Sequence, residues 1–175
     1  MAIQIFEYPD ASELNKIAYP VIRDAEKHYV PGGTAQRTAF NIHKTKEFSK
    51  FNSWVEKTFP KYKIAISWGM LYNVGEGANL HSHSPYPMTF VYYVNVPEDG
   101  SPLIVVDDKY EETIDISTGQ FVFFPGDRWH RVPKATVPGR CIIAGQVTYK
   151  SLLPRILLFL RRYFLGVGLR GKGQK

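Results

Sequence analysis

Residues 64–83 read IAISWGMLYNVGEGANLHSH and combine three patterns on which the expected fold depends. The first nine residues are rich in β-branched and aromatic side chains, which favours a long strand over 64–72. The glycine-containing segment 75–79 is typical of a turn. The last four residues include His81 and His83, whose side chains point to one face if the segment is a strand, because side chains alternate along a strand.

Short strand-like runs continue beyond this stretch as far as residue 148. Turn-forming sequences such as Glu98-Asp99-Gly100 and Pro125-Gly126-Asp127 separate them. Strands this short and closely spaced indicate an antiparallel sandwich or barrel, so we expect a mainly β fold of the jelly-roll type. Besides 64–72, the expected strands cover 3–6, 88–96, 102–106, 112–116, 120–124 and 140–148.

Two helices are expected before most of these strands. The first covers 11–27 and should end or kink at Pro20, because proline lacks the N–H that an interior helical position donates. The second covers 46–59, where apolar side chains recur at spacings of three or four. We therefore expect one jelly-roll domain over 1–150, with a helical part over 1–60 and a β core over 61–150.

Charge is distributed unevenly along the 175 residues. The chain has 22 basic and 16 acidic residues, and its net charge is +6. Six of the basic residues and none of the acidic ones lie in 151–175, so the body before this tail is neutral. The body also has no basic patch with interleaved aromatic residues, and nucleic acid is therefore not an expected partner.

The tail itself is both basic and apolar. Residues 152–160 are strongly apolar, and Pro154 suits the first turn of a helix. This run is far shorter than the roughly 20 residues needed to span a bilayer. We expect a C-terminal helix over part of 151–175 that docks on the body, with contact to a membrane surface or a protein partner as the alternative.

The expected compartment is the cytoplasm. Cys141 is the only cysteine, so no internal disulfide can form, which favours a reducing environment. The first ten residues, MAIQIFEYPD, lack the basic start and apolar run of a secretory signal peptide.

His130 completes a set of three histidines that strand geometry can bring together. It follows the expected strand 120–124, and in a jelly roll a strand this far along the chain can return beside the first one. Neutral imidazole is the commonest metal ligand near neutral pH, which makes the set a candidate metal site. A histidine pair alone is weak evidence, because such residues are often only polar groups in a groove. Arg140, at the start of the last expected strand, adds a guanidinium suited to clamping a carboxylate.

This order of residues resembles the iron(II)- and 2-oxoglutarate-dependent oxygenases. It is most similar to a small family of them that has an H-x-H motif and is common in phages and marine bacteria. The resemblance spans about residues 40–147, and the combination of residues is specific although no single one is. The matching residues are Trp68, Gly77, His81, His83, Thr89, Tyr93, Phe124, Pro125, His130 and Arg140.

The resemblance implies a double-stranded β-helix, which is a cupin-like jelly roll, and it implies roles for individual residues. His81, His83 and His130 would hold iron(II), and Arg140 would pair with the distal carboxylate of 2-oxoglutarate. The further candidates for the co-substrate pocket are Tyr72, Asn73, Tyr93 and Gln146. For the first three of these, ordinary core packing is an equal alternative.

Two departures from the family pattern leave the ligand set open. Most such oxygenases use two histidines and a carboxylate, whereas this chain has His83 at the carboxylate position. Three histidines also suit zinc. Asp107 or Asp108, on a neighbouring hairpin, is therefore a candidate carboxylate ligand. Ile142 stands where many relatives have a serine that touches the co-substrate, and Gln146 is expected to replace that serine in part.

The activity implied is hydroxylation of a substrate by oxygen, with release of succinate and carbon dioxide. The substrate stays open among a peptide side chain, a small molecule and a nucleobase, because fold does not fix function. A phage-encoded enzyme that acts in a host cytoplasm is a further implication. Two rival hypotheses are a cupin-type metalloprotein that does not use 2-oxoglutarate and a non-catalytic structural jelly roll. Arg140 separates them, because only the oxygenase needs it.

Overall fold

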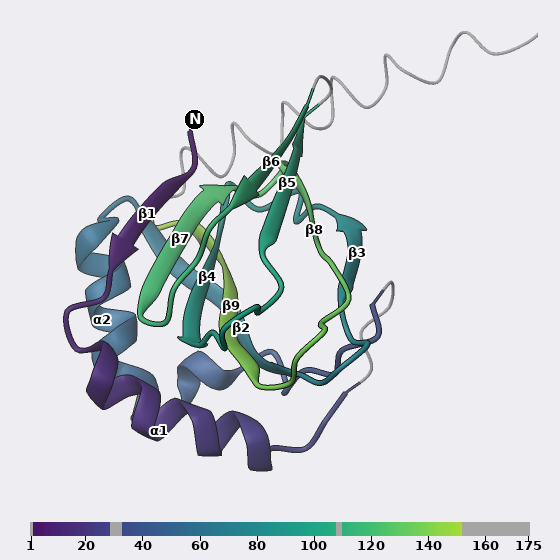
Figure 1. Ribbon diagram of the computed structural model, residues 1–175. Helices are drawn as coiled ribbons and strands as arrows, with labels where there is room; N and C mark the ends of the chain where they lie inside the picture. Colours follow the sequence, from purple (N-terminus) through teal and green to yellow (C-terminus); the bar gives the residue numbers. More distant parts are fainter. Residues whose placement is uncertain (1, 29–32, 108–109, 152–175) are drawn as a thin grey trace, which may run out of the picture.

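Two antiparallel sheets face each other in the computed structural model, which describes residues 2–28, 33–107 and 110–151 (Figure 1). The larger sheet has the order β1-β7-β4-β9-β2, and the smaller has the order β3-β8-β5-β6. The strands of the larger sheet are β1 (Gln4–Glu7), β7 (Gln120–Pro125), β4 (Met88–Asn95), β9 (Arg140–Tyr149) and β2 (Tyr62–Tyr72). The strands of the smaller sheet are β3 (Ala78–His81), β8 (Trp129–Val132), β5 (Leu103–Asp107) and β6 (Tyr110–Ile114).

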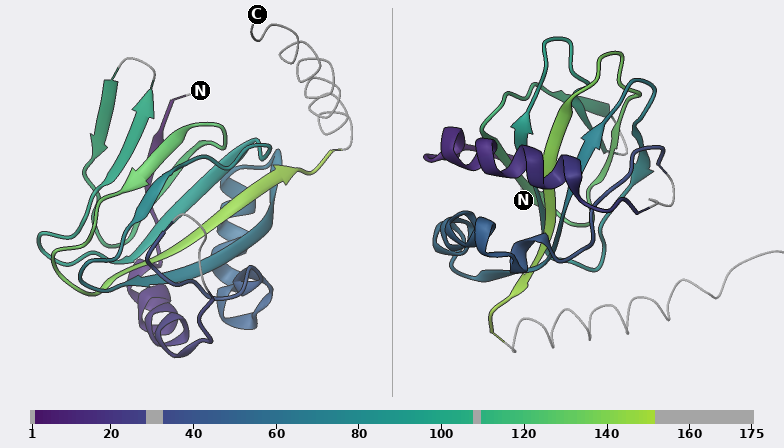
Figure 2. Two further views of the ribbon diagram at one scale, coloured as in Figure 1. Left: turned by 90° about the vertical axis from the view of Figure 1, so that its right-hand side faces the viewer. Right: turned by 90° about the horizontal axis from the view of Figure 1, so that it is seen from below.

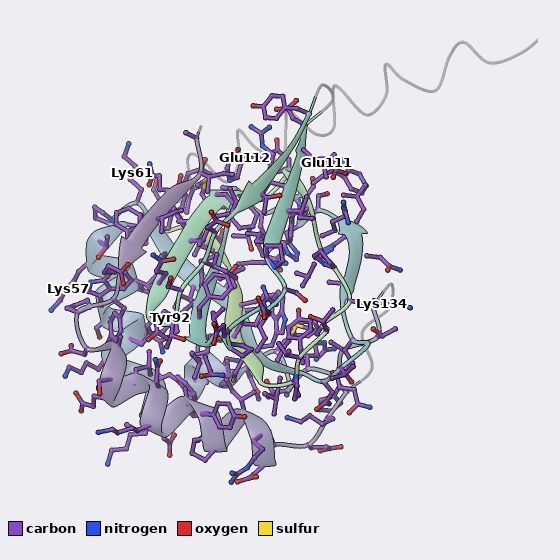
Figure 3. All side chains as sticks on the ribbon, in the orientation of Figure 1. Lys57, Lys61, Tyr92, Glu111, Glu112 and Lys134 are labelled. Atoms are coloured by element: carbon purple, nitrogen blue, oxygen red, sulfur yellow. The ribbon has the colours of Figure 1, made fainter. Side chains whose placement is uncertain are left out.

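Helices cover the outer face of the larger sheet. These are α1 (Ala11–Asp24) and α2 (Ser49–Thr58), which lie on the same side of the strands (Figure 2). Two short 3-10 turns, η1 (Ile42–Lys44) and η2 (Lys46–Phe48), lead into α2. The charged side chains of Lys57 and Lys61 point away from the sheet, beside α2 (Figure 3). No helix in the described part of the chain is long and apolar enough to cross a membrane.

Alternation of side chains along the larger sheet creates two separate cores. On β4, Phe90 and Tyr92 belong to the core beneath the helices, whereas Val91 and Tyr93 belong to the core between the two sheets. Both faces of this sheet are buried, which explains why its strands are almost continuously apolar in sequence. The polar residues of the site described below come from the face between the two sheets.

Packing of α1 on β2 overrides the helix-breaking tendency of Pro20. Leu14, Ala18 and Ile22 recur every four residues and are buried against the sheet. Ile22 sits over Gly69 so closely that a side chain at Gly69 would collide with it. The expected end at Pro20 is therefore wrong, because α1 continues through this residue to Asp24.

The expected secondary structure is otherwise close to the observed one, with shifts at the ends. The second helix is a 3-10 turn followed by α2, and the strand expected over 112–116 is β6 at 110–114. The strand β8, which carries His130, was not expected as a separate element. The C-terminal helix expected within 151–175 falls almost entirely on 152–175, outside the residues that the structure describes.

Candidate metal centre and its cavity

Three histidines converge between the two sheets. His81 at the end of β3 lies directly opposite His130 on β8, and the ring centroids are 4.3 Å apart. The ring of His83 lies 4.9 Å from His81 and 5.0 Å from His130. One ring nitrogen from each residue lies within 4.8 Å of the others, a spacing at which the three could hold one metal ion. The convergence of the three candidate metal ligands is thus as expected.

His83 reaches this cluster by a different route from the expected one. β3 ends at His81, so alternation along a strand does not place His83 beside it. Instead, the backbone N–H of His83 donates to the carbonyl oxygen of Gly126 at 2.6 Å, in the turn between β7 and β8. Gly126 has no room for a side chain, because a Cβ there would collide with the carbonyl of Tyr86. A contact between two loops therefore fixes His83.

The Nδ1 atom of each histidine has a partner, which leaves Nε2 for a metal. Nδ1 of His81 lies 2.7 Å from the carbonyl oxygen of Asn79, and Nδ1 of His130 lies 3.0 Å from that of Arg128. A carbonyl only accepts, so each Nδ1 carries the proton and each Nε2 keeps its lone pair. Acceptors of this kind typically orient histidines that bind metals.

The partner of the third histidine is a side chain. The Nε2 atom of Gln146 lies 2.7 Å from Nδ1 of His83, and its Oε1 atom is buried without a partner among the described residues. A half-turn of the amide presents Oε1 to Nδ1 instead, with both amide orientations filling the same space. His83 then donates from Nδ1, as the other two histidines do. Gln146 thus lines the cavity, beside a candidate metal ligand.

Burial keeps the inner two imidazoles neutral. Burial, together with the proximity of His130 and His81, lowers the pKa of His83 to about 3. Burial followed by the proximity of His81 lowers the pKa of His130 to about 4. A neutral imidazole offers the lone pair that a metal ligand needs. His83 and His130 are therefore in the form that binds a cation even before a metal is present.

Arg140 is a buried cation in the same region. It opens β9 opposite Tyr72, and only 1% of its surface is exposed. Its Nε and Nη1 atoms have no hydrogen-bond partner among the described residues, and neither has the hydroxyl of Tyr93. The guanidinium carbon lies 4.8 Å from the ring centroid of Tyr72 and 5.3 Å from that of Tyr93. Buried N–H and O–H groups without hydrogen-bond partners are costly, so the free Nε and Nη1 donors of Arg140 fit a carboxylate.

One cavity of about 520 Å³ connects the histidines with Arg140. This volume is typical of a small-molecule site. Most of its walls are apolar, and the described residues that line it include no aspartate or glutamate. Tyr72 and Gln146 line the cavity, whereas Tyr93 is not among its lining residues.

Two of the candidate site residues lie elsewhere. Asn73 is exposed in the turn after β2, where its backbone N–H and its amide both approach Oε2 of Glu76, so its expected place in the pocket is wrong. Asp107 forms an ion pair with Arg128. The metal-ligating cluster among the described residues consists of the three histidines and includes no carboxylate. Asp108 falls outside those residues.

Two lining residues, Arg37 and Phe40, had no recognisable pattern in the sequence. They belong to the irregular segment before α2, which forms single bridges to Met70 and Ser67 of β2. Such bridges involve neither periodic apolar positions nor a motif. Only the presence of an arginine close to an aromatic residue was visible in the sequence.

Comparison with solved structures identifies the fold. The chain is similar to a prolyl-4-hydroxylase from Pseudomonas putida, with a TM-score of 0.68 and 17% identity over 86% of this chain and 92% of that one. It is similar to the viral collagen prolyl hydroxylase of Paramecium bursaria Chlorella virus-1 in its 2-oxoglutarate complex, with a TM-score of 0.66 and 12% identity over 84% and 96%. It is also similar to HygX from Streptomyces hygroscopicus with nickel, 2-oxoglutarate and hygromycin B bound, with a TM-score of 0.67 and 8% identity over 85% and 83%.

The protein therefore has the double-stranded β-helix fold of these oxygenases, which confirms the expected fold class. No family model matches the sequence, and no curated protein matches it.

Proposed function

We propose that the protein is an iron(II)- and 2-oxoglutarate-dependent oxygenase that hydroxylates its substrate. The observation that carries this proposal is the buried guanidinium of Arg140 in the same cavity as the three histidines, with its Nε and Nη1 atoms lacking a hydrogen-bond partner among the described residues. A metal site alone fits many activities. A metal site with a carboxylate clamp in a mainly apolar cavity fits a co-substrate that chelates the metal and carries a second carboxylate.

The metal and the distal carboxylate of the co-substrate would bind at opposite ends of the cavity. His81, His83 and His130 would hold iron through their Nε2 atoms, and Arg140 would fix the distal carboxylate of 2-oxoglutarate. Burial raises the pKa of Tyr93, beside Arg140, to about 12 and keeps its hydroxyl protonated. When bound, iron and 2-oxoglutarate supply the activation of oxygen, with release of succinate and carbon dioxide. The apolar walls exclude water from the reacting groups.

Anaerobic titration with iron(II) and 2-oxoglutarate tests this proposal. We expect a visible metal-to-ligand charge-transfer band that needs both components. His130→Ala should abolish it, and Arg140→Ala should raise the 2-oxoglutarate concentration required by about 100-fold, because a charge-assisted clamp is lost. Arg131→Ala is the matched control, since Arg131 pairs with Glu111 on the surface of the smaller sheet.

A second candidate function is favoured by the all-histidine cluster. Three histidines are also the ligands of catalytic zinc sites, and no described carboxylate joins them. A cupin-type metalloprotein that does not use 2-oxoglutarate would bind metal without giving the band. Normal turnover by Arg140→Ala would also favour this alternative over the oxygenase.

The finer assignment is to the H-x-H oxygenases of phages and marine bacteria, acting in a reducing cytoplasm. The support is the order of Trp68, the histidine cluster and Arg140 along the chain, together with a single cysteine that is buried. Retention of activity in a strong thiol reductant would be expected of such a protein, and its loss would contradict the assignment.

A further inference from the structure

We propose that the substrate is a small molecule that joins a planar apolar group to an oxyanion, either a carboxylate or a phosphate, and that Arg37 binds this oxyanion in the cavity. This inference rests on the proposed function, because it assigns the substrate class of the same site. It gives the second arginine of the cavity a role distinct from that of Arg140.

The arginines of the cavity differ from those at the surface in whether they form ion pairs with acidic side chains. Arg23, Arg128 and Arg131 each form an ion pair with an acidic side chain at the surface. Arg37 and Arg140 line the cavity, and neither has a carboxylate partner in the part of the chain that the structure describes. Among the described residues, the cavity lining thus has two guanidinium groups and no carboxylate, so it favours a ligand with negative charge.

The 2-oxoglutarate of the proposed reaction satisfies only one of these two arginines. Its distal carboxylate would pair with Arg140, and its other end would be at the metal. Arg37 joins the cavity from outside the larger sheet, where its backbone bridges to Met70 on the edge strand β2. It therefore remains available to a second anion once the co-substrate is in place.

Two contacts hold the side chain of Arg37 in place and leave some N–H groups of its guanidinium free. Its Nη1 donates to the carbonyl oxygen of Thr38 at 2.8 Å, and its guanidinium carbon lies 3.5 Å from the ring centroid of Phe40. One donor is used and the ring covers one face, so the remaining N–H groups can bind an oxyanion. Part of the entropy cost of holding this side chain is met before the ligand arrives.

Aromatic rings connect Arg37 with the metal centre. The ring of Phe40 packs edge-on against Trp68 at 5.1 Å, and the ring of Trp68 lies 5.9 Å from that of His83. Phe40 is 43% exposed although it is a large apolar residue. This aromatic wall suits a planar apolar group, and Arg37 places the positive charge at its far end. The part of the substrate that lies beside Trp68 would then be next to the metal.

Calorimetric binding of three matched probes tests the inference. Phenylacetate, phenyl phosphate and phenylacetamide share a ring and differ in charge, and they would be titrated into the protein saturated with 2-oxoglutarate, so that Arg140 is occupied. We expect one or both anions to bind at least about tenfold more tightly than the amide. Arg37→Gln should abolish this difference, whereas Arg131→Gln should preserve it. The tighter of the two anions identifies the oxyanion.

Several outcomes would overturn the inference. Equal affinities for the three probes, no binding of any of them, or an anion preference that survives in Arg37→Gln would each do so. Phenylacetate binding that 2-oxoglutarate abolishes and Arg37→Gln leaves intact would place the anion on Arg140. A preference shown only by acidic peptides would replace the small molecule with a peptide substrate.

The two proposals fail in different ways. The charge-transfer band reports the metal and the co-substrate, and Arg37→Gln should leave it unchanged, because the side-chain contacts of Arg37 among the described residues are with Thr38 and Phe40. If the band is intact but the protein shows no preference for the anions, only the substrate assignment is contradicted. If the anion preference depends on Arg37 but no band forms, the cavity still binds anions and the proposed oxygenase function is contradicted.

Discussion

Gln146 is the residue whose role differs most between sequence and structure. Its position six residues after Arg140 suggested a contact with the co-substrate, in place of the serine of many relatives. In the structure its amide instead contacts Nδ1 of His83 at 2.7 Å. Backbone carbonyls orient the other two histidines, whereas a side chain orients this one. A mutation of Gln146 can therefore alter the geometry of His83 without changing any of the three histidines that are proposed to hold the metal.

Substituting Gln146 tests this positioning role. Gln146→Leu removes the acceptor for Nδ1–H of His83, and we expect metal affinity to fall by about tenfold, the lower limit for loss of a group that orients a ligand. Gln146→Glu keeps an acceptor oxygen at the same reach and should retain most of the affinity. Competition with a colorimetric chelator for zinc measures both variants. Equal affinity of Gln146→Leu and the unmodified protein would show that Gln146 does not orient His83.

Among the elements, α1, α2 and the outer face of the larger sheet share one aromatic core. Phe121 of β7 is its centre, fully buried, with six aromatic rings whose centroids lie 5.2 to 6.5 Å away. They come from β1, α2, the segment after α2, β4 and β7 itself. The residues are Phe6, Phe51, Trp54, Phe59, Phe90 and Phe123.

Phe121→Ala should destabilise the whole domain. Removal of a buried phenylalanine costs about 3–5 kcal/mol of unfolding free energy, through lost burial and the cavity left behind. Trp129→Ala removes a larger ring that is 51% exposed and should change the unfolding free energy by less than about 1 kcal/mol. Urea denaturation followed by circular dichroism measures both. A small effect of Phe121→Ala would mean that the helices do not depend on this core.

Pro20→Ala should stabilise the protein. Pro20 occupies the tenth position of α1 and cannot donate the hydrogen bond that an interior position normally donates. Alanine restores the donor at the cost of a more flexible unfolded chain, so we expect a net gain of about 1–2 kcal/mol. Lys16→Ala, at an exposed position of the same helix, should have little effect in the same denaturation experiment. A loss of stability in Pro20→Ala would show that the proline ring makes packing contacts that outweigh the missing bond.

The molecule as a whole was predictable from the sequence in its architecture and in its chemistry-bearing residues. Alternation and turn residues predicted the β class, and the motif predicted the three histidines and Arg140. The rest depended on contacts between distant segments. The loop contact of His83 with Gly126 and the bridge of Arg37 to Met70 have no local pattern. Pro20 does not end α1, because burial of one helix face outweighs local helix propensity.

Cys141 provides a probe of global unfolding. This thiol is fully buried on β9, and burial raises its pKa to about 12, well above that of a free cysteine. At pH 8 we therefore expect the folded protein to react with a disulfide reagent only through unfolding, while the denatured chain reacts at once. Following the absorbance of the released thiolate, with and without denaturant, gives the two rates. Equal rates would show that β9 opens locally.

The two faces of β9 have separate consequences for directed evolution. Ile142 and Ala144 face the cavity, whereas Cys141 and Ile143 face the core beneath the helices. A library that varies Ile142 and Ala144 should yield mostly folded variants with altered substrate preference, and one that varies Cys141 and Ile143 should yield mostly insoluble protein. New specificities are therefore accessible by changing alternate codons of a single strand, without first adding stabilising mutations.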